Sequence, residues 1–245
     1  MTTTSLQERP IQPSSSEIRV LPDKLGIDIE LVVVFLSLLS LTGQSIKYLT
    51  VYDEAFGLIP LVNMGKTLSI PTIFTVLLYF MAFLLLGMIS AVKLADKDQF
   101  RWQWCGLTGL FLYLAFDRGT ALHTYVFKLV RGWVSGLLPF FPYHRWVFSL
   151  GLVLIILVCF YLKFFKALPK ETLKRALVSL GIYYLGFLLI ERFGDDFAAI
   201  YSTNSFVFSI LLTLGKTLEM SGLAAATYTL LKYLELTIPE ISLEL

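Results

Sequence analysis

The stretch from Ile70 to Val92 constrains the fold of this chain more than any other, because it contains no charged residue. A helix needs about 20 predominantly apolar residues to cross the hydrocarbon core of a bilayer, and this stretch is long enough. Ser69 precedes it as a potential N-cap, and Pro71 falls in the first turn, where its missing N–H costs no hydrogen bond. The stretch therefore predicts a transmembrane helix.

The composition extends this prediction to the whole chain. Of its 245 residues, 56% are hydrophobic and only 16% are charged, which lies outside the range of soluble globular domains. The formal net charge of +2 is too small to indicate a nucleic-acid partner, and the charges lie in blocks between apolar runs. The expected fold is an all-α, polytopic transmembrane helical bundle whose main partner is the lipid bilayer.

Five further segments are candidate spans. They are residues 27–48, 102–123, 146–162, 176–192 and 205–233. With the first stretch they predict about six spans within one transmembrane domain over residues 25–235. The Ser-, Thr- and Pro-rich residues 1–24 are expected to be a disordered tail, and residues 236–245 a short C-terminal tail.

Residues 125–138 show a different pattern. Apolar residues recur at helical spacing, including Val126, Leu129, Val130 and Trp133, while the charged residues fall between them. The segment is too short to cross a bilayer. It is expected to be an amphipathic helix that either lies in the headgroup plane or caps the bundle.

The basic residues predict the orientation. With six spans and both termini on one side, that side carries twelve Lys and Arg residues: Arg9, Arg19, Lys24, Lys93, Lys97, Arg101, Lys163, Lys166, Lys170, Lys174, Arg175 and Lys232. The other side carries six: Lys47, Lys66, Lys128, Arg131, Arg145 and Arg192. The positive-inside rule places both termini in the cytoplasm, and the expected location is the plasma (inner) membrane.

Ionisable residues inside the predicted spans are the candidate functional residues, because each is costly in hydrocarbon unless it is paired, hydrated or used. They are Asp117, Arg118, His123, Glu191, Lys216 and Glu219. Lys216 and Glu219 share a helix face, so they can pair directly or meet Asp117 and Arg118 across an interface. One interpretation is an ion-pair network that fixes helix register. The other is a solute or proton pathway, or a hydrolytic site.

The sequence predicts neither a metal site nor a cofactor. A catalytic zinc site needs about three protein ligands, and the chain has only two histidines. Cys105 and Cys159 both lie inside apolar segments and form no metal-binding motif. No catalytic residue can be assigned from these patterns.

Three short stretches carry a resemblance. They are SIPTIFT at residues 69–75, FLYLAFD at residues 111–117 with His123 following, and LEMSG at residues 218–222. They resemble a family of uncharacterised bacterial multipass membrane proteins, over residues 52–233. The resemblance implies more acidic residues at these places than this chain has, since it carries Asn63, Thr67, Arg118, Thr124 and Lys216 there. It implies the architecture and no activity.

The expected function is therefore that of a structural, assembly or partner-binding membrane component, since the sequence shows no demonstrable enzymatic equipment. Its expected partner is another membrane protein or a second copy of the chain. The alternatives are a small-solute or ion transporter that uses the charged cluster, and an intramembrane lipid-processing hydrolase built around His123. A water-filled cavity at the cluster favours transport, a dry paired cluster favours the scaffold, and three convergent ligands including His123 favour the enzyme.

Overall fold

The structure, a computed structural model, describes residues 22–50, 54–66, 68–122, 125–126, 128, 160–202 and 205–237. The regular elements in these residues are all helical: α1 (Pro22–Leu49), the short 3-10 helix η1 (Ala55–Gly57), α2 (Leu58–Val62), α3 (Ile70–Ala95), α4 (Arg101–Thr120), α7 (Lys170–Tyr201) and α8 (Phe206–Thr237). Residues 160–167 are helical as well. The all-α prediction is confirmed for this part of the chain.

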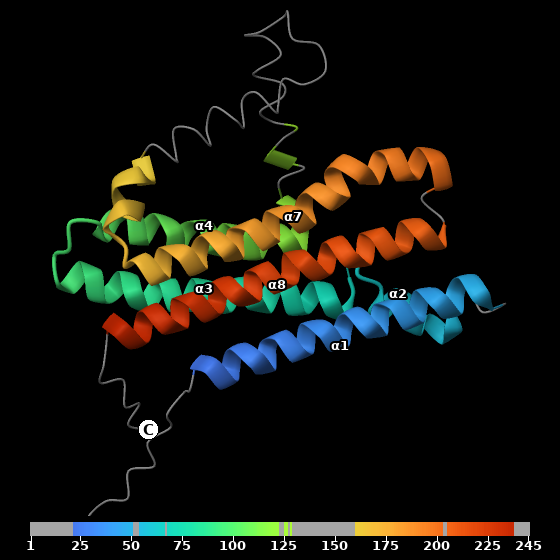
Figure 1. The fold of residues 1–245 in the computed structure, drawn as a ribbon, viewed down its shortest axis with the longest axis horizontal. Coiled ribbons are helices and arrows are strands. Elements are labelled where there is room, and N and C mark those ends of the chain that lie inside the picture. The colour runs from blue at the N-terminus through green and yellow to red at the C-terminus, as the bar shows by residue number, and fades with distance from the viewer. Residues whose placement is uncertain are drawn as a thin grey trace, which may run out of the picture.

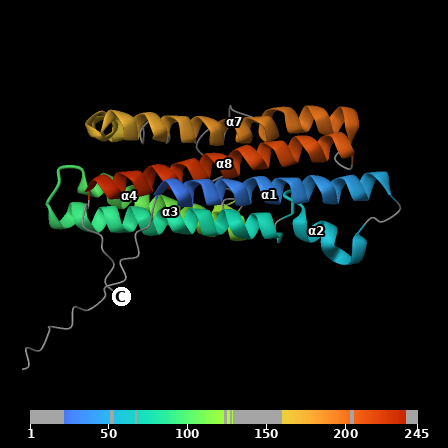
Figure 2. The ribbon, with the colours of Figure 1, turned by 60° about the horizontal axis from the view of Figure 1, so that its bottom comes forward.

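The five long helices run along one common axis (Figures 1 and 2). Helix α8 packs against α7, α1 and α3, and α3 also packs against α4. Only a few residues separate α3 from α4 and α7 from α8, so each pair is antiparallel. Lys232 near the end of α8 lies 3.0 Å from Asp23 at the start of α1, which brings both ends of the described helical region together.

Four helices are long and apolar enough to cross a membrane. They are Pro22–Leu49, Ile70–Ala95, Lys170–Ile190 within α7, and Phe206–Thr237. They correspond to the first, second, fifth and sixth predicted spans. Helix α4 forms where the third was expected but does not meet the same apolar standard within the described residues, and most of the fourth, at residues 146–162, lies outside them. Six spans are thus not confirmed.

The start of α3 follows the sequence prediction. Ser69 has an extended backbone and its hydroxyl accepts a hydrogen bond from the backbone N–H of Thr72 at 3.4 Å, while Pro71 occupies the first turn. The Ser69 hydroxyl also donates to the carbonyl of Lys66 at 3.1 Å. Capping satisfies N–H groups that lack partners within the helix, which fixes the point where α3 begins.

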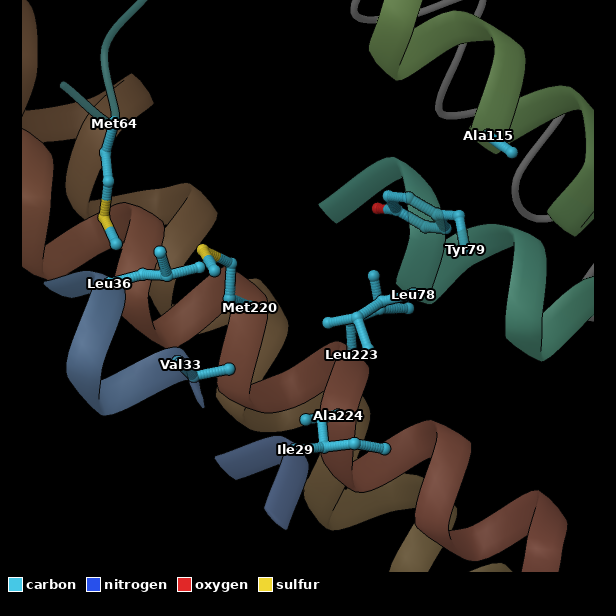
Figure 3. Close-up of a cluster of buried hydrophobic side chains, with 10 residues drawn as sticks. All are labelled: Ile29, Val33, Leu36, Met64, Leu78, Tyr79, Ala115, Met220, Leu223 and Ala224. Carbon is cyan, nitrogen blue, oxygen red and sulfur yellow. The ribbon is translucent and has the colours of Figure 1, made fainter. Parts of the chain in front are cut away.

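A buried apolar cluster fills the middle of the bundle (Figure 3). Helix α8 contributes Met220, Leu223 and Ala224; α1 contributes Ile29, Val33 and Leu36; α3 contributes Leu78 and Tyr79; Ala115 and Met64 complete the cluster. In Figure 3, Leu223 lies beside Leu78, and Ile29 lies beside Ala224. This core explains why α8 is the central element: it supplies side chains that face both α1 and α3.

A second cluster lies at the end of the bundle that holds Asp23 and Lys232. The ring of Trp104 on α4 stacks on Tyr233 of α8, with centroids 4.9 Å apart, and meets Phe164 edge-on at 4.9 Å. Tyr161 donates a hydrogen bond to the carbonyl of Gln103 at 2.9 Å. These contacts hold the helical residues 160–167 against α4 and α8.

Helices α7 and α8 approach closely at glycines. A Cβ atom at Gly222 would lie 2.5 Å from the backbone nitrogen of Tyr183, and one at Gly186 would lie 2.5 Å from the carbonyl oxygen of Gly215. The obstructing atoms belong to backbone and have no rotamer with which to move away. Small residues at such crossings are typical of helix pairs in membranes.

Candidate functional site

The best-defined polar contact inside the bundle is the ion pair between Lys216 and Glu219 on α8. The ammonium nitrogen of Lys216 lies 2.9 Å and 2.8 Å from the two carboxylate oxygens of Glu219. The side chains are 17% and 7% exposed. The i, i+3 spacing puts both on one helix face, as expected from the sequence. The pairing offsets part of the cost of placing two charges in a low-dielectric environment.

Two tyrosines extend this pair into a larger cluster. Tyr79 of α3 donates a hydrogen bond to the hydroxyl of Tyr183 of α7 at 2.8 Å. The charges of Glu219 and Arg118 act on both hydroxyls, and the charge of Asp117 also acts on Tyr183. We call Tyr79, Asp117, Arg118, Tyr183, Lys216 and Glu219 the central polar cluster. It joins side chains from α3, α4, α7 and α8.

Helix α4 supplies the other charged members of the cluster. Asp117 and Arg118 are half-buried in its last turn. The Nε atom of Arg118 is buried and has no hydrogen-bond partner among the described residues. The helix remains intact through Gly119 and ends at Thr120, where Ala121 adopts the left-handed conformation. Because the helix ends before residue 123, helix geometry does not fix the position of Asp117 relative to His123, which lies outside the described residues.

The remaining predicted site residues are less fully placed. Glu191 lies within α7, which continues past it to Tyr201, but the structure describes only its backbone. His123 lies outside the described residues, as does most of the predicted amphipathic helix 125–138. Residues 125, 126 and 128 of that segment are helical. The hydrolase built around His123 stays untested.

Sequence reasoning missed the two tyrosines of the cluster. Tyr79 lies in the middle of α3, far from the helix ends where membrane tyrosines usually meet the interface. A buried tyrosine hydroxyl needs a hydrogen-bond partner, so a tyrosine in mid-span indicates a polar neighbour on another helix. That signal was present in the sequence, although it could not identify Tyr183 as the partner.

A second set of polar contacts joins α1 to α8 along their antiparallel interface. Ser221 donates to the Glu30 carboxylate at 2.6 Å, and Thr217 donates to the Ser37 hydroxyl at 2.8 Å. Nearer the two ends, Tyr228 donates to Asp23 at 2.7 Å and Ser209 donates to Tyr48 at 3.3 Å. The partners on α1 recur at intervals of two or three helical turns, so they follow one face of that helix. These bonds specify the register of α1 against α8.

The described residues offer few features of a binding site at the cluster. They include no group of three or more His, Cys, Asp or Glu side chains placed to hold a metal ion. Two shallow grooves lie elsewhere, one along the start of α7 and one between α1 and α8 near Asp23 and Tyr228. Neither groove is lined by a member of the central polar cluster.

The fold and this polar cluster define an all-helical bundle whose four long apolar helices fit a membrane protein. Residues 27–233 match the family model described as Domain of unknown function (DUF8692), so the chain belongs to that family. None of the curated proteins and none of the solved structures compared with the chain shows a significant match. The resemblance to bacterial multipass membrane proteins stays a prediction.

Proposed function

We propose that this protein is a multi-pass plasma-membrane protein with both termini in the cytoplasm and a structural, assembly or partner-binding role. The orientation is supported by the basic residues at the end of the bundle that holds Asp23 and Lys232. Exposed lysines at this end are Lys24, Lys97, Lys163, Lys166, Lys170 and Lys174. The opposite end of the described bundle carries Lys47 and Lys66. This asymmetry is the one that the positive-inside rule associates with the cytoplasm.

The proposal includes α4 as a further crossing. Helix α4 lies antiparallel along α3, so it occupies the same depth as a helix that is long and apolar enough to cross a membrane. The hydroxyls of Ser90 on α3 and Thr108 on α4 lie 2.8 Å apart, which gives two of the polar groups between the helices a partner. The span expected at residues 146–162 stays a prediction.

The observation that supports a scaffold role is the direct pairing of Lys216 with Glu219. Both carboxylate oxygens of Glu219 accept hydrogen bonds from the same ammonium group, and the Glu219 residue is only 5% exposed. A charged group that is satisfied by its own helix fixes the local packing and has little free capacity for a passing solute. The hydrogen bonds between α1 and α8 also favour a scaffold role, because they specify one register of the two helices.

We place the partner-binding surface on α4. Of its side chains only Trp104 and Ala115 are buried, although the helix carries Gln103, Asp117 and Arg118 among its polar residues. Phe116 is 60% exposed on this helix. A polar transmembrane helix is stabilised by protein neighbours better than by lipid, and a membrane-protein partner or second copy of the chain supplies them.

Site-specific photocrosslinking in native membranes tests this role. A benzophenone side chain at Phe116 is expected to give one defined protein adduct, whereas the same group at Phe35 of α1, which is 62% exposed, should give lipid adducts only. An adduct of twice the chain mass identifies a second copy, and any other single species identifies a separate partner. Lipid adducts alone at both positions would contradict the partner-binding role.

A second candidate function is small-solute or ion transport. The observation in its favour is the buried Nε atom of Arg118, which has no hydrogen-bond partner within the polar cluster. Proteoliposomes that contain a pH-sensitive dye test it under an imposed membrane potential. A proton flux that depends on Glu219, and disappears in Glu219→Gln, would favour transport over the scaffold.

A further inference from the structure

We propose that the groove at the start of α7 binds an anionic phospholipid. The phosphate is held by Lys170 and Lys174, and an acyl chain lies along Leu177 and Val178. This inference goes beyond the proposed scaffold role, since it requires only that α7 crosses the membrane. The groove has a volume of about 420 Å³ and is lined by Lys170, Leu173, Lys174, Leu177 and Val178.

The two lysines are arranged for a phosphate group. They are one helical turn apart, so they lie on the same face of α7, and both are exposed. Lys163 and Lys166 on the preceding helical segment, also exposed, add positive charge at the same end of the bundle. The acidic residue among them is Glu171, which is exposed on a neighbouring position of the helix and does not line the groove.

The rest of the groove suits an acyl chain. Leu177 and Val178 are 58% and 52% exposed, and the face of α7 continues apolar to Leu188. At 1.5 Å per residue, the stretch from Leu177 to Leu188 rises about 16 Å, which is about the thickness of one leaflet. The lysines therefore lie at headgroup depth when the leucines lie in the hydrocarbon.

A lipid from the surrounding bilayer fits this groove better than a protein segment does. Only 11% of the most apolar part of α7 is buried within the described bundle, so the groove opens onto the face that α7 presents to hydrocarbon. Charge complementarity selects among lipids. An anionic headgroup is attracted to two adjacent lysines, whereas the cationic group of a zwitterionic lipid is repelled.

The test uses the purified full chain reconstituted with spin-labelled phosphatidylglycerol or phosphatidylcholine, and it measures the relative association of each label by electron paramagnetic resonance. The wild-type protein should prefer phosphatidylglycerol. Lys170→Gln with Lys174→Gln should reduce this preference about 25-fold, because each lysine that contacts the anionic headgroup contributes about fivefold to such binding. The matched control removes two other exposed lysines at the same end, by Lys24→Gln with Lys97→Gln, and should leave the preference largely intact.

A second variant tests the acyl part of the groove without a change in charge. Leu173→Trp fills the groove and should reduce phosphatidylglycerol association although both lysines remain. Equal losses in the two lysine pairs, or no preference in the wild-type protein, would mean that general surface charge accounts for the binding and would overturn the proposal. Displacement of the labelled lipid by millimolar glycerol phosphate, with no effect of Leu173→Trp, would assign the lysines to free phosphate compounds and would also overturn it.

Discussion

The hydroxyl oxygens of Tyr79 on α3 and Tyr183 on α7 lie 2.8 Å apart in the interior of the bundle. Both helices pack against α8. The charges of Glu219 and Arg118 act on both hydroxyls. The tyrosine pair therefore joins α3 to α7 in the interior of the bundle. Of the two arrangements that the sequence allowed for Lys216 and Glu219, the structure has their direct pairing, and a contact between them and Asp117 or Arg118 stays a prediction.

The first prediction concerns this hydrogen bond. Tyr79→Phe removes the donor and leaves the Tyr183 hydroxyl without that partner, so it should lower the free energy of unfolding by about 0.5–1.5 kcal/mol. Tyr183→Phe should have a similar effect, and the double variant should cost clearly less than the sum of the two. Thermal unfolding of the purified variants in detergent measures all three.

Tyr184→Phe is the matched control for this cycle. Tyr184 is adjacent to Tyr183 but is 54% exposed, so loss of its hydroxyl should change the unfolding temperature little. Strictly additive losses in the Tyr79 and Tyr183 variants would show that the two hydroxyls are not energetically coupled.

The second prediction concerns the ion pair on α8. Lys216→Met leaves the carboxylate of Glu219 buried without its ammonium partner and should cost about 3–5 kcal/mol, seen as a loss of folded yield. Adding Glu219→Gln should restore part of that yield, because the stranded charge is then removed. The measurement is the fraction of monodisperse protein in fluorescence-detected size-exclusion chromatography.

An exposed ion pair provides the comparison. Lys232 pairs with Asp23 at 3.0 Å, but Asp23 is 67% exposed, so Lys232→Met should cost at most about 1 kcal/mol. If Lys216→Met and Lys232→Met lower the stability equally, the Lys216–Glu219 pair is no more buried in the folded protein than the Lys232–Asp23 pair.

Local signals predicted the helices well where a cap or a long uncharged run was present. Helix α3 begins at Ile70, as the Ser69 cap and Pro71 indicated. The predicted end of the fifth span did not indicate where helix α7 ends. The helix continues through Glu191, Arg192 and two aspartates to Tyr201. Charged residues end the apolar part of a membrane helix, but they do not interrupt its backbone hydrogen bonds. Apolarity therefore predicted the span and not the length of the helix.

The candidate site was predictable to the extent that its contacts are local. Lys216 and Glu219 lie three residues apart on one helix, so their pairing follows from helix geometry alone. The Glu30–Ser221 and Tyr79–Tyr183 contacts join distant parts of the chain. They depend on the register and rotation of one helix against another, which the packing of many side chains determines and which no single motif reports.

The third prediction concerns topology. If both termini are cytoplasmic, a reporter fused after Leu245 or inserted at Lys97 should give a cytoplasmic signal, because the α3–α4 turn lies at the same end of the bundle as the start of α1 and the end of α8. A reporter inserted at Lys66 or Ser202 should give an external signal, since both positions lie at the opposite end. A cytoplasmic signal at Lys66 together with one at Lys97 would contradict the proposed crossing of α3.

The last prediction concerns the close approach of α7 and α8. Gly222→Val places a Cβ where only 2.5 Å separates it from the backbone nitrogen of Tyr183, so the helices must move apart. Overpacking of this kind costs about 1–3 kcal/mol, and here it also stretches the Tyr79–Tyr183 bond.

Gly181→Val is the matched control, because no atom lies within 4 Å of the added Cβ on this exposed face of α7. Unfolding temperatures should fall for Gly222→Val and stay close to wild type for Gly181→Val. Combining Gly222→Val with Tyr183→Phe should add little further loss, because the displaced helix has already weakened that bond; a full additional loss would show that α7 keeps its position despite the larger side chain.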